Sequence, residues 1–455
     1  MGKLRGFILK NKIDCIFLLN AIVFGYIFKF ARIVGDDAVH ITAIGDATVL
    51  EQIKYNLDMY TTWTSRVLLN SVWTVALGHG CVAFAVFMGF CAFVMTEGLF
   101  QLFGRKDSVT DALFVIFAMM LFPFRILTSA GWVATTGTYF ATSAMMVYGL
   151  VPIKRFYNGE SIKIWEFPLF VIALIWAGNF EQSCITLLLL YGVWFVYGFI
   201  AKKVRWEAFA FLGVNIASLV FILTCPGNWI RKQEEAKLFP TYKMMGFLDK
   251  TELATSLTLK WIFVDSIPII VFAMGLIAFI AVKKYKTSAM SFVAAFPFVI
   301  AALLGPLGEI TYPLFPTATK LKELLNYYGA VNVENQGGGL GAFQLFAFLI
   351  LVVCMIAGLM LINDKLEGFL CDLCLAMAAV GTGAMMGFSP TIYVSKLRIY
   401  STLNICIMLV AAHVYAAHRE MIVTEKSKAA VRCGMMVFIL IGYIELIGNV
   451  LTFAV

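Results

Sequence analysis

The chain contains many separate apolar runs, each long enough to cross a membrane as a helix. The hydrocarbon core of a bilayer is about 30 Å thick and takes roughly 20 helical residues to span. The runs are continuous and lack the period-two alternation of outer-membrane barrels. We therefore predict a single integral membrane domain over residues 1–455, an all-α polytopic protein. Its thirteen predicted spans lie near 14–34, 78–103, 109–127, 132–151, 165–178, 182–201, 206–225, 261–282, 288–305, 342–362, 369–388, 398–418 and 431–453.

Composition agrees with this class and excludes others. Hydrophobic residues make up 61% of the chain and charged residues only 14%, whereas a soluble domain carries about 25% charged residues. Such a chain cannot cover its surface with polar groups in water. A soluble multidomain enzyme and a protein with a single membrane anchor are both excluded.

The basic residues predict the orientation, because short cytoplasmic loops are enriched in Lys and Arg. The N-terminal segment before the first span carries four basic residues, and alternate loops carry the others. We therefore expect a retained first span with a cytoplasmic N-terminus. The net charge of +8 is then mainly a topology signal, and the scattered basic residues form no stripe that would bind nucleic acid. These loops contain Arg105/Lys106, Lys154/Arg155, Lys202/Lys203/Arg205, Lys283/Lys284/Lys286 and Arg419/Lys426/Lys428.

The opposite side carries three longer segments, at 35–77, 226–260 and 306–341. Loops longer than about 12–15 residues in a compact protein tend to be functional. We therefore predict that the working face is extracytoplasmic. Within 306–341 we expect a short helix over 317–328, followed by a glycine hinge at 337–339, which together could form a lid over the site.

An acidic pair follows the first predicted span, in Gly35-Asp36-Asp37-Ala38-Val39-His40. Adjacent carboxylates at a membrane boundary repel each other and are costly to desolvate, which is typical of a general base, a metal ligand or both. Solvated acids at the boundary are the alternative. His40 could orient the acid, ligate a metal or simply be solvated.

The acidic pair is followed by an amphipathic pattern over 48–60, with Val49, Leu50, Ile53, Leu57 and Tyr60 at helical spacing. This pattern predicts a helix lying in the membrane interface. A Tyr60-Thr61-Thr62-Trp63-Thr64-Ser65-Arg66 element comes next, and then a more apolar helix that leads into the second span.

These motifs resemble those of polytopic glycosyltransferases of the GT-C superfamily, especially the bacterial ones that decorate O-antigen and cell-wall polysaccharides. The matching segments are Gly35-Asp36-Asp37, Tyr60-x-x-Trp63-x-x-Arg66, Gly178-Asn179-Phe180-Glu181 and Pro226-Gly227-Asn228-x-x-Arg231. Ser65 departs from the pattern, which has Gly before the Arg.

The resemblance implies a multi-pass protein of the bacterial cytoplasmic membrane, with two juxtamembrane helices in the first external loop. It implies a catalytic acid at the end of the first span and, as partners, a polyprenyl-phosphate sugar in the bilayer and a surface polysaccharide or lipid-linked glycan acceptor.

Transfer of a sugar from a lipid phosphate needs a base for the acceptor hydroxyl and cations for the leaving phosphate. Asp36 or Asp37 can supply the base for an inverting displacement, and the sequence does not separate them. A divalent metal is compatible with these residues but not required. The predicted phosphate ligands are Arg66, Arg125, Arg231 and Arg398, each of which could instead be an interfacial anchor. The predicted substrate contacts are Trp63, Asn179, Glu181, Asn228, His40 and Tyr400.

Two other functions fit the same composition. A flippase or transporter of lipid-linked saccharides would place ionisable residues on broken helices near the bilayer midplane. A polysaccharide polymerase or ligase would also use outward arginines, but usually has one very large external loop. The acids and arginines here gather mostly at the outer boundary, which favours the transferase.

Overall fold

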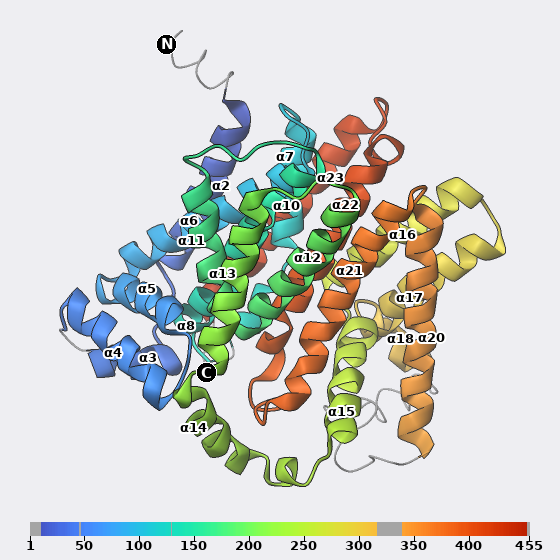
Figure 1. Cartoon of the computed structure of the whole chain (residues 1–455). Helices are drawn as coiled ribbons and strands as arrows, with labels where there is room; N and C mark the ends of the chain where they lie inside the picture. The colour runs from blue at the N-terminus through green and yellow to red at the C-terminus, as the bar shows by residue number, and fades with distance from the viewer. Residues whose placement is uncertain (1–10, 45–46, 129, 316–338, 453–455) are drawn as a thin grey trace. The chain divides into compact units, whose positions relative to one another are not determined.

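A computed structural model of the protein describes residues 11–44, 47–128, 130–315 and 339–452. These residues form helices and connecting segments, with no β-strand among them (Figure 1). The chain divides into two compact units. Unit 1 comprises residues 1–120, 124–233 and 426–455, and unit 2 comprises 121–123 and 234–425.

The helices of unit 1 include the segments that the sequence predicts between the first two spans. They are α2 (Lys12–Phe28), α3 (Asp36–Ile44), α4 (Val49–Thr62), α5 (Val67–Gly78), α6 (Cys81–Phe103), α7 (Val109–Met120), η1 (Phe124–Thr128), α8 (Trp132–Thr135), η2 (Thr136–Phe140), α9 (Ala141–Gly149), α10 (Val151–Tyr157), α11 (Phe167–Gly178), α12 (Glu181–Ile200), α13 (Trp206–Leu223), α14 (Pro226–Glu235) and α23 (Lys428–Thr452).

Unit 2 contains longer helices joined by short 3-10 and π turns. They are η3 (Ala236–Leu238), η4 (Pro240–Lys243), α15 (Phe247–Lys260), η5 (Trp261–Asp265), α16 (Pro268–Tyr285), α17 (Ala289–Leu304), α18 (Gly308–Leu314), α20 (Gly339–Ile362), α21 (Leu366–Ala384), η6 (Met385–Phe388), η7 (Lys396–Tyr400) and α22 (Ser401–Ile422).

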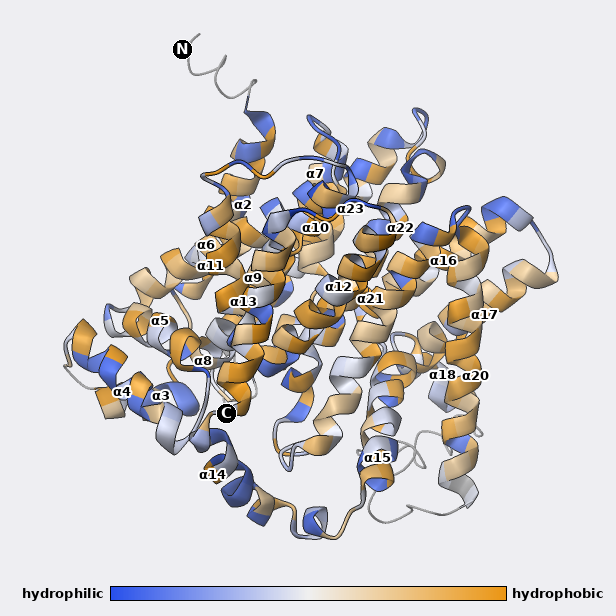
Figure 2. Ribbon diagram, in the orientation of Figure 1, coloured by the Kyte–Doolittle hydropathy of each residue, from blue (hydrophilic) through white to orange (hydrophobic). Residues whose placement is uncertain are grey.

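The prediction of a polytopic helical membrane protein is confirmed. Within the described ranges, eight helices are long and apolar enough to span a membrane, and nine if the bent pair α17–α18 counts as one span. Hydrophobic residues run along most helices, and hydrophilic residues gather toward their ends and in the connections (Figure 2). The eight candidates are Cys81–Phe103, Glu181–Ile200, Trp206–Leu223, Pro268–Tyr285, Gly341–Ile362, Leu366–Phe388, Lys396–Ile422 and Lys428–Leu451.

The other predicted spans coincide with shorter or interrupted helices, so the total of thirteen stays a prediction. The ranges 14–34, 109–127 and 165–178 contain α2, α7 and α11, with 17, 12 and 12 residues. The range 132–151 contains α8 and α9 joined by the π turn η2. The range 288–305 contains α17, which bends by 84° into α18. The helix expected over 317–328 lies outside the described residues.

Two glycines allow α2 and α6 to cross at backbone contact. A Cβ atom on Gly25 would collide with the carbonyl oxygen of Ala85, and one on Gly89 would lie 2.8 Å from the carbonyl oxygen of Ala21. Small residues at such crossings are typical of helices that pack in membranes. The Phe24 ring packs against Phe140 near this crossing, with ring centroids 5.3 Å apart. In unit 1, the helix that precedes the segment starting at Gly35 is therefore closely packed against α6.

Candidate functional site

The two adjacent aspartates have different environments. Gly35, at a φ of +59°, directly precedes α3, and the N–H of Asp36 donates to the carbonyl of Ala130 at 2.8 Å. The Asp37 side chain is fully buried, whereas Asp36 is exposed. The two side chains differ in burial because α3 begins at Asp36, and successive residues of a helix point about 100° apart.

The buried carboxylate of Asp37 caps another helix. Its oxygens accept hydrogen bonds from the N–H groups of Val133, at 3.0 Å, and Ala134, at 2.8 Å. These are N-terminal amides of α8, which have no partner inside their own helix. Gly131, at a φ of +120°, makes room for the cap, because a Cβ there would lie 2.7 Å from the Asp37 carboxylate.

Burial raises the pKa of Asp37 to about 6, despite the opposing hydrogen bonds from Ala134 and Val133. The negative charge of Asp36 adds to the rise in this pKa. Both carboxylate oxygens of Asp37 already hold backbone amides, and Asp36 is open to a ligand. Asp36 is therefore the accessible carboxylate of the pair, and the carboxylate of Asp37 is engaged within the fold.

His40 lies one helical turn after Asp36 and packs edge-on against Trp73, with ring centroids 4.8 Å apart. Burial lowers the pKa of His40, and the charge of Asp36 opposes this effect. The position of His40 one turn after Asp36 is compatible with the predicted orienting role. That role, like the predicted substrate contact of His40, stays a prediction.

The amphipathic helix predicted over 48–60 is α4. Thr48 and Glu51 form a capping box at its start: the Glu51 carboxylate accepts from the Thr48 N–H at 2.8 Å, and the Glu51 N–H donates to the Thr48 hydroxyl. The inward face is polar, since the amide of Asn56 donates to the hydroxyl of Thr74 in α5 at 3.0 Å. Leu50 and Leu57 are 75% and 57% exposed. The apolar face of α4 thus points away from the protein, as an interfacial helix requires.

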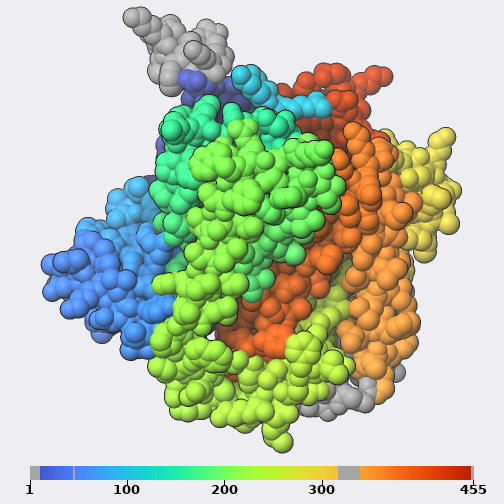
Figure 3. All heavy atoms as spheres, viewed as in Figure 1, coloured from blue at the N-terminus to red at the C-terminus, as the bar shows by residue number. Residues whose placement is uncertain are grey.

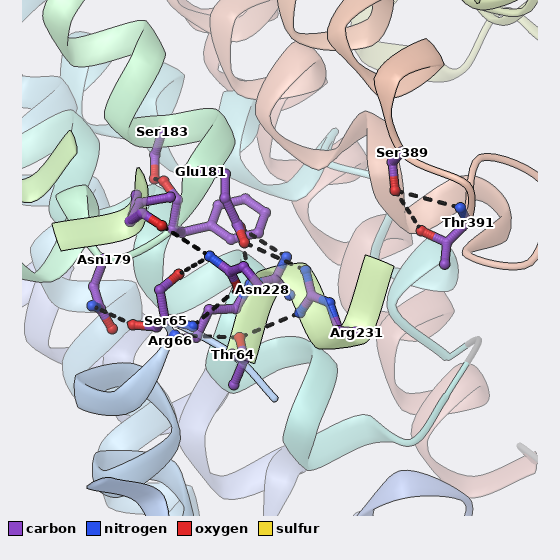
Figure 4. A network of polar contacts seen from close by, with 12 residues as sticks. Thr64, Ser65, Arg66, Asn179, Glu181, Ser183, Asn228, Arg231, Ser389 and Thr391 are labelled. Carbon is purple, nitrogen blue, oxygen red and sulfur yellow. Dashed lines mark hydrogen bonds and ion pairs between the residues drawn. The ribbon is translucent and has the colours of Figure 1, made fainter. Parts of the chain in front are cut away.

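Three segments far apart in the sequence meet next to α4 (Figure 4). The Asn179 carbonyl accepts from the N–H groups of Leu68 and Leu69, at 3.1 and 3.3 Å, and its amide donates to the carbonyl of Ser65 at 2.9 Å. The Asn228 carbonyl accepts from the Ser65 N–H at 3.2 Å, and its amide donates to the Ser65 hydroxyl at 3.0 Å. The two asparagines therefore fix the backbone of residues 64–69. Their predicted substrate contacts stay predictions.

A shared ion pair completes this junction. The Arg66 guanidinium contacts the Glu181 carboxylate through Nη2 at 2.8 Å and Nε at 3.0 Å, and it lies 4.7 Å from the centre of the Phe180 ring. Arg231 Nη2 lies 3.6 Å from the other oxygen of Glu181, and Arg231 Nη1 donates to the Thr64 hydroxyl at 3.3 Å. The three charged side chains keep about a fifth of their surface exposed, at 21–22%. We call residues 64–66, 179–181 and 228–231 the arginine junction.

Other predicted residues lie outside the arginine junction. Trp63 ends α4 and is 40% exposed, and its backbone adjoins α14, because a Cβ on Gly227 would collide with the Trp63 N–H. Arg125 is exposed on η1 of unit 1. Arg398 and Tyr400 belong to η7 of unit 2. Tyr400 is buried against Trp261, with ring centroids 5.0 Å apart, so that its ring serves packing in unit 2.

Sequence reasoning missed the residues that connect the segments, chiefly Thr64, Ser65 and Phe180. Their signal was their position inside the motifs, but nothing in the sequence pairs them across more than 100 positions. The divalent metal, compatible with Asp36, Asp37 and His40, gains no further ligands here: the described part of the chain brings no three His, Cys, Asp or Glu side chains together for a metal ion.

Comparison with known proteins yields no relative: no protein-family model, curated protein or solved structure matches the chain.

Proposed function

We propose that the protein is a membrane-embedded glycosyltransferase of the GT-C type. It would move a sugar from a polyprenyl phosphate to a surface polysaccharide or lipid-linked glycan on the extracytoplasmic side of a bacterial cytoplasmic membrane. One observation carries the proposal: three motif segments that are separate in the sequence, containing Arg66, Glu181 and Arg231, converge on one shared ion pair. Two guanidinium groups at one place suit a phosphate, which arginine binds through paired N–H donors.

The proposed chemistry is a single inverting displacement. The carboxylate of Asp36 takes the proton of the acceptor hydroxyl as its oxygen forms a bond to the anomeric carbon. The bond from that carbon to the phosphate oxygen breaks, and the polyprenyl phosphate leaves with the electron pair. Arg66 and Arg231 stabilise the charge that develops on the leaving phosphate.

The test is reconstitution of the purified protein with a panel of polyprenyl-phosphate sugars and a cell-wall glycan acceptor. We expect one donor to be consumed by the wild type and none by the Asp36→Asn/Asp37→Asn double variant. Arg105→Ala, at an exposed arginine in a loop predicted to be cytoplasmic, is the matched control and should retain activity. Consumption of the donor by the double variant at the wild-type rate would remove the transferase proposal.

A second candidate, a transporter of lipid-linked saccharides, is favoured by a feature of unit 2. The π turn η5 ends α15, and Ser266 follows it in the left-handed region at a φ of 33°. Lys260 and Asp265 form an ion pair at 3.0 Å across this turn. Broken helices that carry paired charges are typical of transporters. Movement of a lipid-linked sugar between the leaflets of liposomes without an acceptor, lost in Asp265→Asn, would favour this candidate.

A further inference from the structure

A row of large apolar side chains is exposed on unit 2, where the chain enters α15. Segments near residues 230–250 lie on the visible surface of the molecule, in yellow-green (Figure 3). We call Leu238, Met244, Phe247, Leu248 and Phe388 the apolar ridge. Their exposed fractions are 62%, 86%, 70%, 72% and 41%. Four of the five residues lie outside the candidate membrane spans, so lipid contact along a span does not account for their exposure. Large exposed apolar groups of this kind mark an interaction surface.

Buried side chains anchor the segment that carries the apolar ridge. Phe239 and Tyr242, which alternate with the ridge residues, are buried. The Phe239 ring packs 5.0 Å from Tyr393, and the Lys250 ammonium lies 4.1 Å from the centre of the Tyr242 ring. A Cβ on Gly387 would collide with the carbonyl oxygen of Lys250, so η6 and α15 touch at the backbone. The inward side chains thus anchor the segment while the ridge residues point outward.

The position of the ridge relative to a membrane span follows from Phe388. This residue is the last of the candidate span Leu366–Phe388, and the Phe247 ring lies 5.3 Å from it. The end of a membrane span marks the boundary between acyl chains and headgroups. If the end of this candidate span is taken as that boundary, Phe247 and its chain neighbour Leu248 lie close to it.

Basic side chains accompany the ridge. Lys237 is 68% exposed, although its ammonium pairs with the exposed carboxylate of Glu234. Lys243, next to Met244, is also exposed. Lysines beside apolar groups at a membrane surface extend their ammonium groups to lipid phosphates while their stems stay in the apolar layer.

We propose that the apolar ridge is a membrane-docking surface, with Leu238, Met244, Phe247 and Leu248 inserted at the headgroup–acyl boundary of a phospholipid bilayer. Lys237 and Lys243 then contact lipid phosphates. This surface holds the start of α15 against the membrane whichever reaction the protein performs, so it is independent of the proposed transferase activity.

The test uses a fluorophore at single introduced cysteines in the full chain. Cys371 and Cys433, the exposed cysteines among the described residues, are first replaced by serine. Met244→Cys and Leu248→Cys are then labelled with bimane in phospholipid nanodiscs. Thr287→Cys, at an exposed polar residue between α16 and α17, is the matched control. Lipids with a nitroxide on acyl carbon 5 quench a label at the boundary, and aqueous iodide quenches a label in water.

We expect the lipid nitroxide to quench the Met244 and Leu248 labels at least threefold more than the Thr287 label, and iodide to quench them less. Quenching by iodide as strong as at Thr287 would overturn the proposal. Protection of both labels from both quenchers, together with a dimer by light scattering, would also overturn it and assign the ridge to a second copy of the chain.

Discussion

Among the contacts between the segment α3–α5 and the rest of unit 1, two differ in their chemistry. At one end the buried Asp37 carboxylate caps α8 through backbone amides. At the other end the arginine junction joins three segments through side chains that stay about a fifth exposed, at 21–22%. The buried carboxylate of Asp37 has a structural role in capping α8. A partly exposed arginine of the junction can instead exchange its carboxylate partner for a ligand. Holding the segment and binding a substrate are therefore separate tasks, and the variants below separate them.

Asp36→Asn should have the largest effect on activity. We expect sugar transfer to fall by about 10²–10⁴-fold, as for loss of a general base, with unfolding unchanged, because Asp36 is exposed. Initial rates and thermal unfolding of the same preparation measure both effects. A variant that keeps wild-type rates would move the role of base away from Asp36.

The pH dependence of stability should identify the cap. The pKa of Asp37 is raised from 3.8 to about 6 in the folded state, so between these values the folded protein holds more protons than the unfolded one. Stability then falls as pH rises through this window, by about 3 kcal/mol for this group, and the loss is complete above pH 6.

Unfolding midpoints at pH 4 and 7.5, compared between the wild type and Asp37→Asn, measure this term. The asparagine cannot ionise, so the variant should lack that part of the slope. Identical slopes in the two proteins would show that the carboxyl does not titrate in this range.

Asn179→Ala should weaken the arginine junction without touching a charge. It leaves the N–H groups of Leu68 and Leu69 at the start of α5 without their acceptor. We expect a loss of about 1–2 kcal/mol of stability, the usual cost of removing a helix cap. Asn158→Ala, at an exposed asparagine whose amide donates to the Glu160 carboxylate at 2.9 Å, is the control in chemical unfolding. Equal losses in both variants would remove the positioning role of Asn179.

Arg231→Ala should have the smallest effect of the four. Its pair with Glu181 is long, at 3.6 Å, so we expect stability to change little and the KM for the lipid donor to rise about fivefold, which is about 1 kcal/mol. Steady-state kinetics with Arg105→Ala alongside would measure this rise. If KM is unchanged while stability falls by more than 1 kcal/mol, Arg231 acts in the fold and not in donor binding.

Local patterns in the sequence predicted the helices well. The amphipathic spacing over 48–60 is a short-range pattern, and α4 begins within one residue of it. The π turn inside 132–151 and the bend after α17 were not predicted, because apolar periodicity does not distinguish a continuous helix from an interrupted one. The number of spans was the least reliable part of the prediction for this reason.

The sequence predicted which motifs belong to the candidate site, but it did not predict how their side chains are arranged in space. The sequence left Asp36 and Asp37 equivalent, because only packing against α8 buries one of them. It likewise gave no reason for Asn179 and Asn228 to bind the backbone of residues 65–69, since such pairs are fixed by tertiary contacts. The sequence analysis grouped Arg398 and Tyr400 with Arg66 as site residues. In the structure Arg398 and Tyr400 belong to unit 2, whereas Arg66 belongs to unit 1.

The glycine crossing of α2 and α6 gives the candidate base a distant support. Only a few residues separate the end of α2 at Phe28 from the start of α3 at Asp36. A single methyl group on Gly25 would have to push α2 away from the Ala85 carbonyl, and this short connection would pass the displacement on to Asp36. The position of the proposed catalytic carboxylate thus depends on the close packing of α2 against α6, at residues that do not contact it.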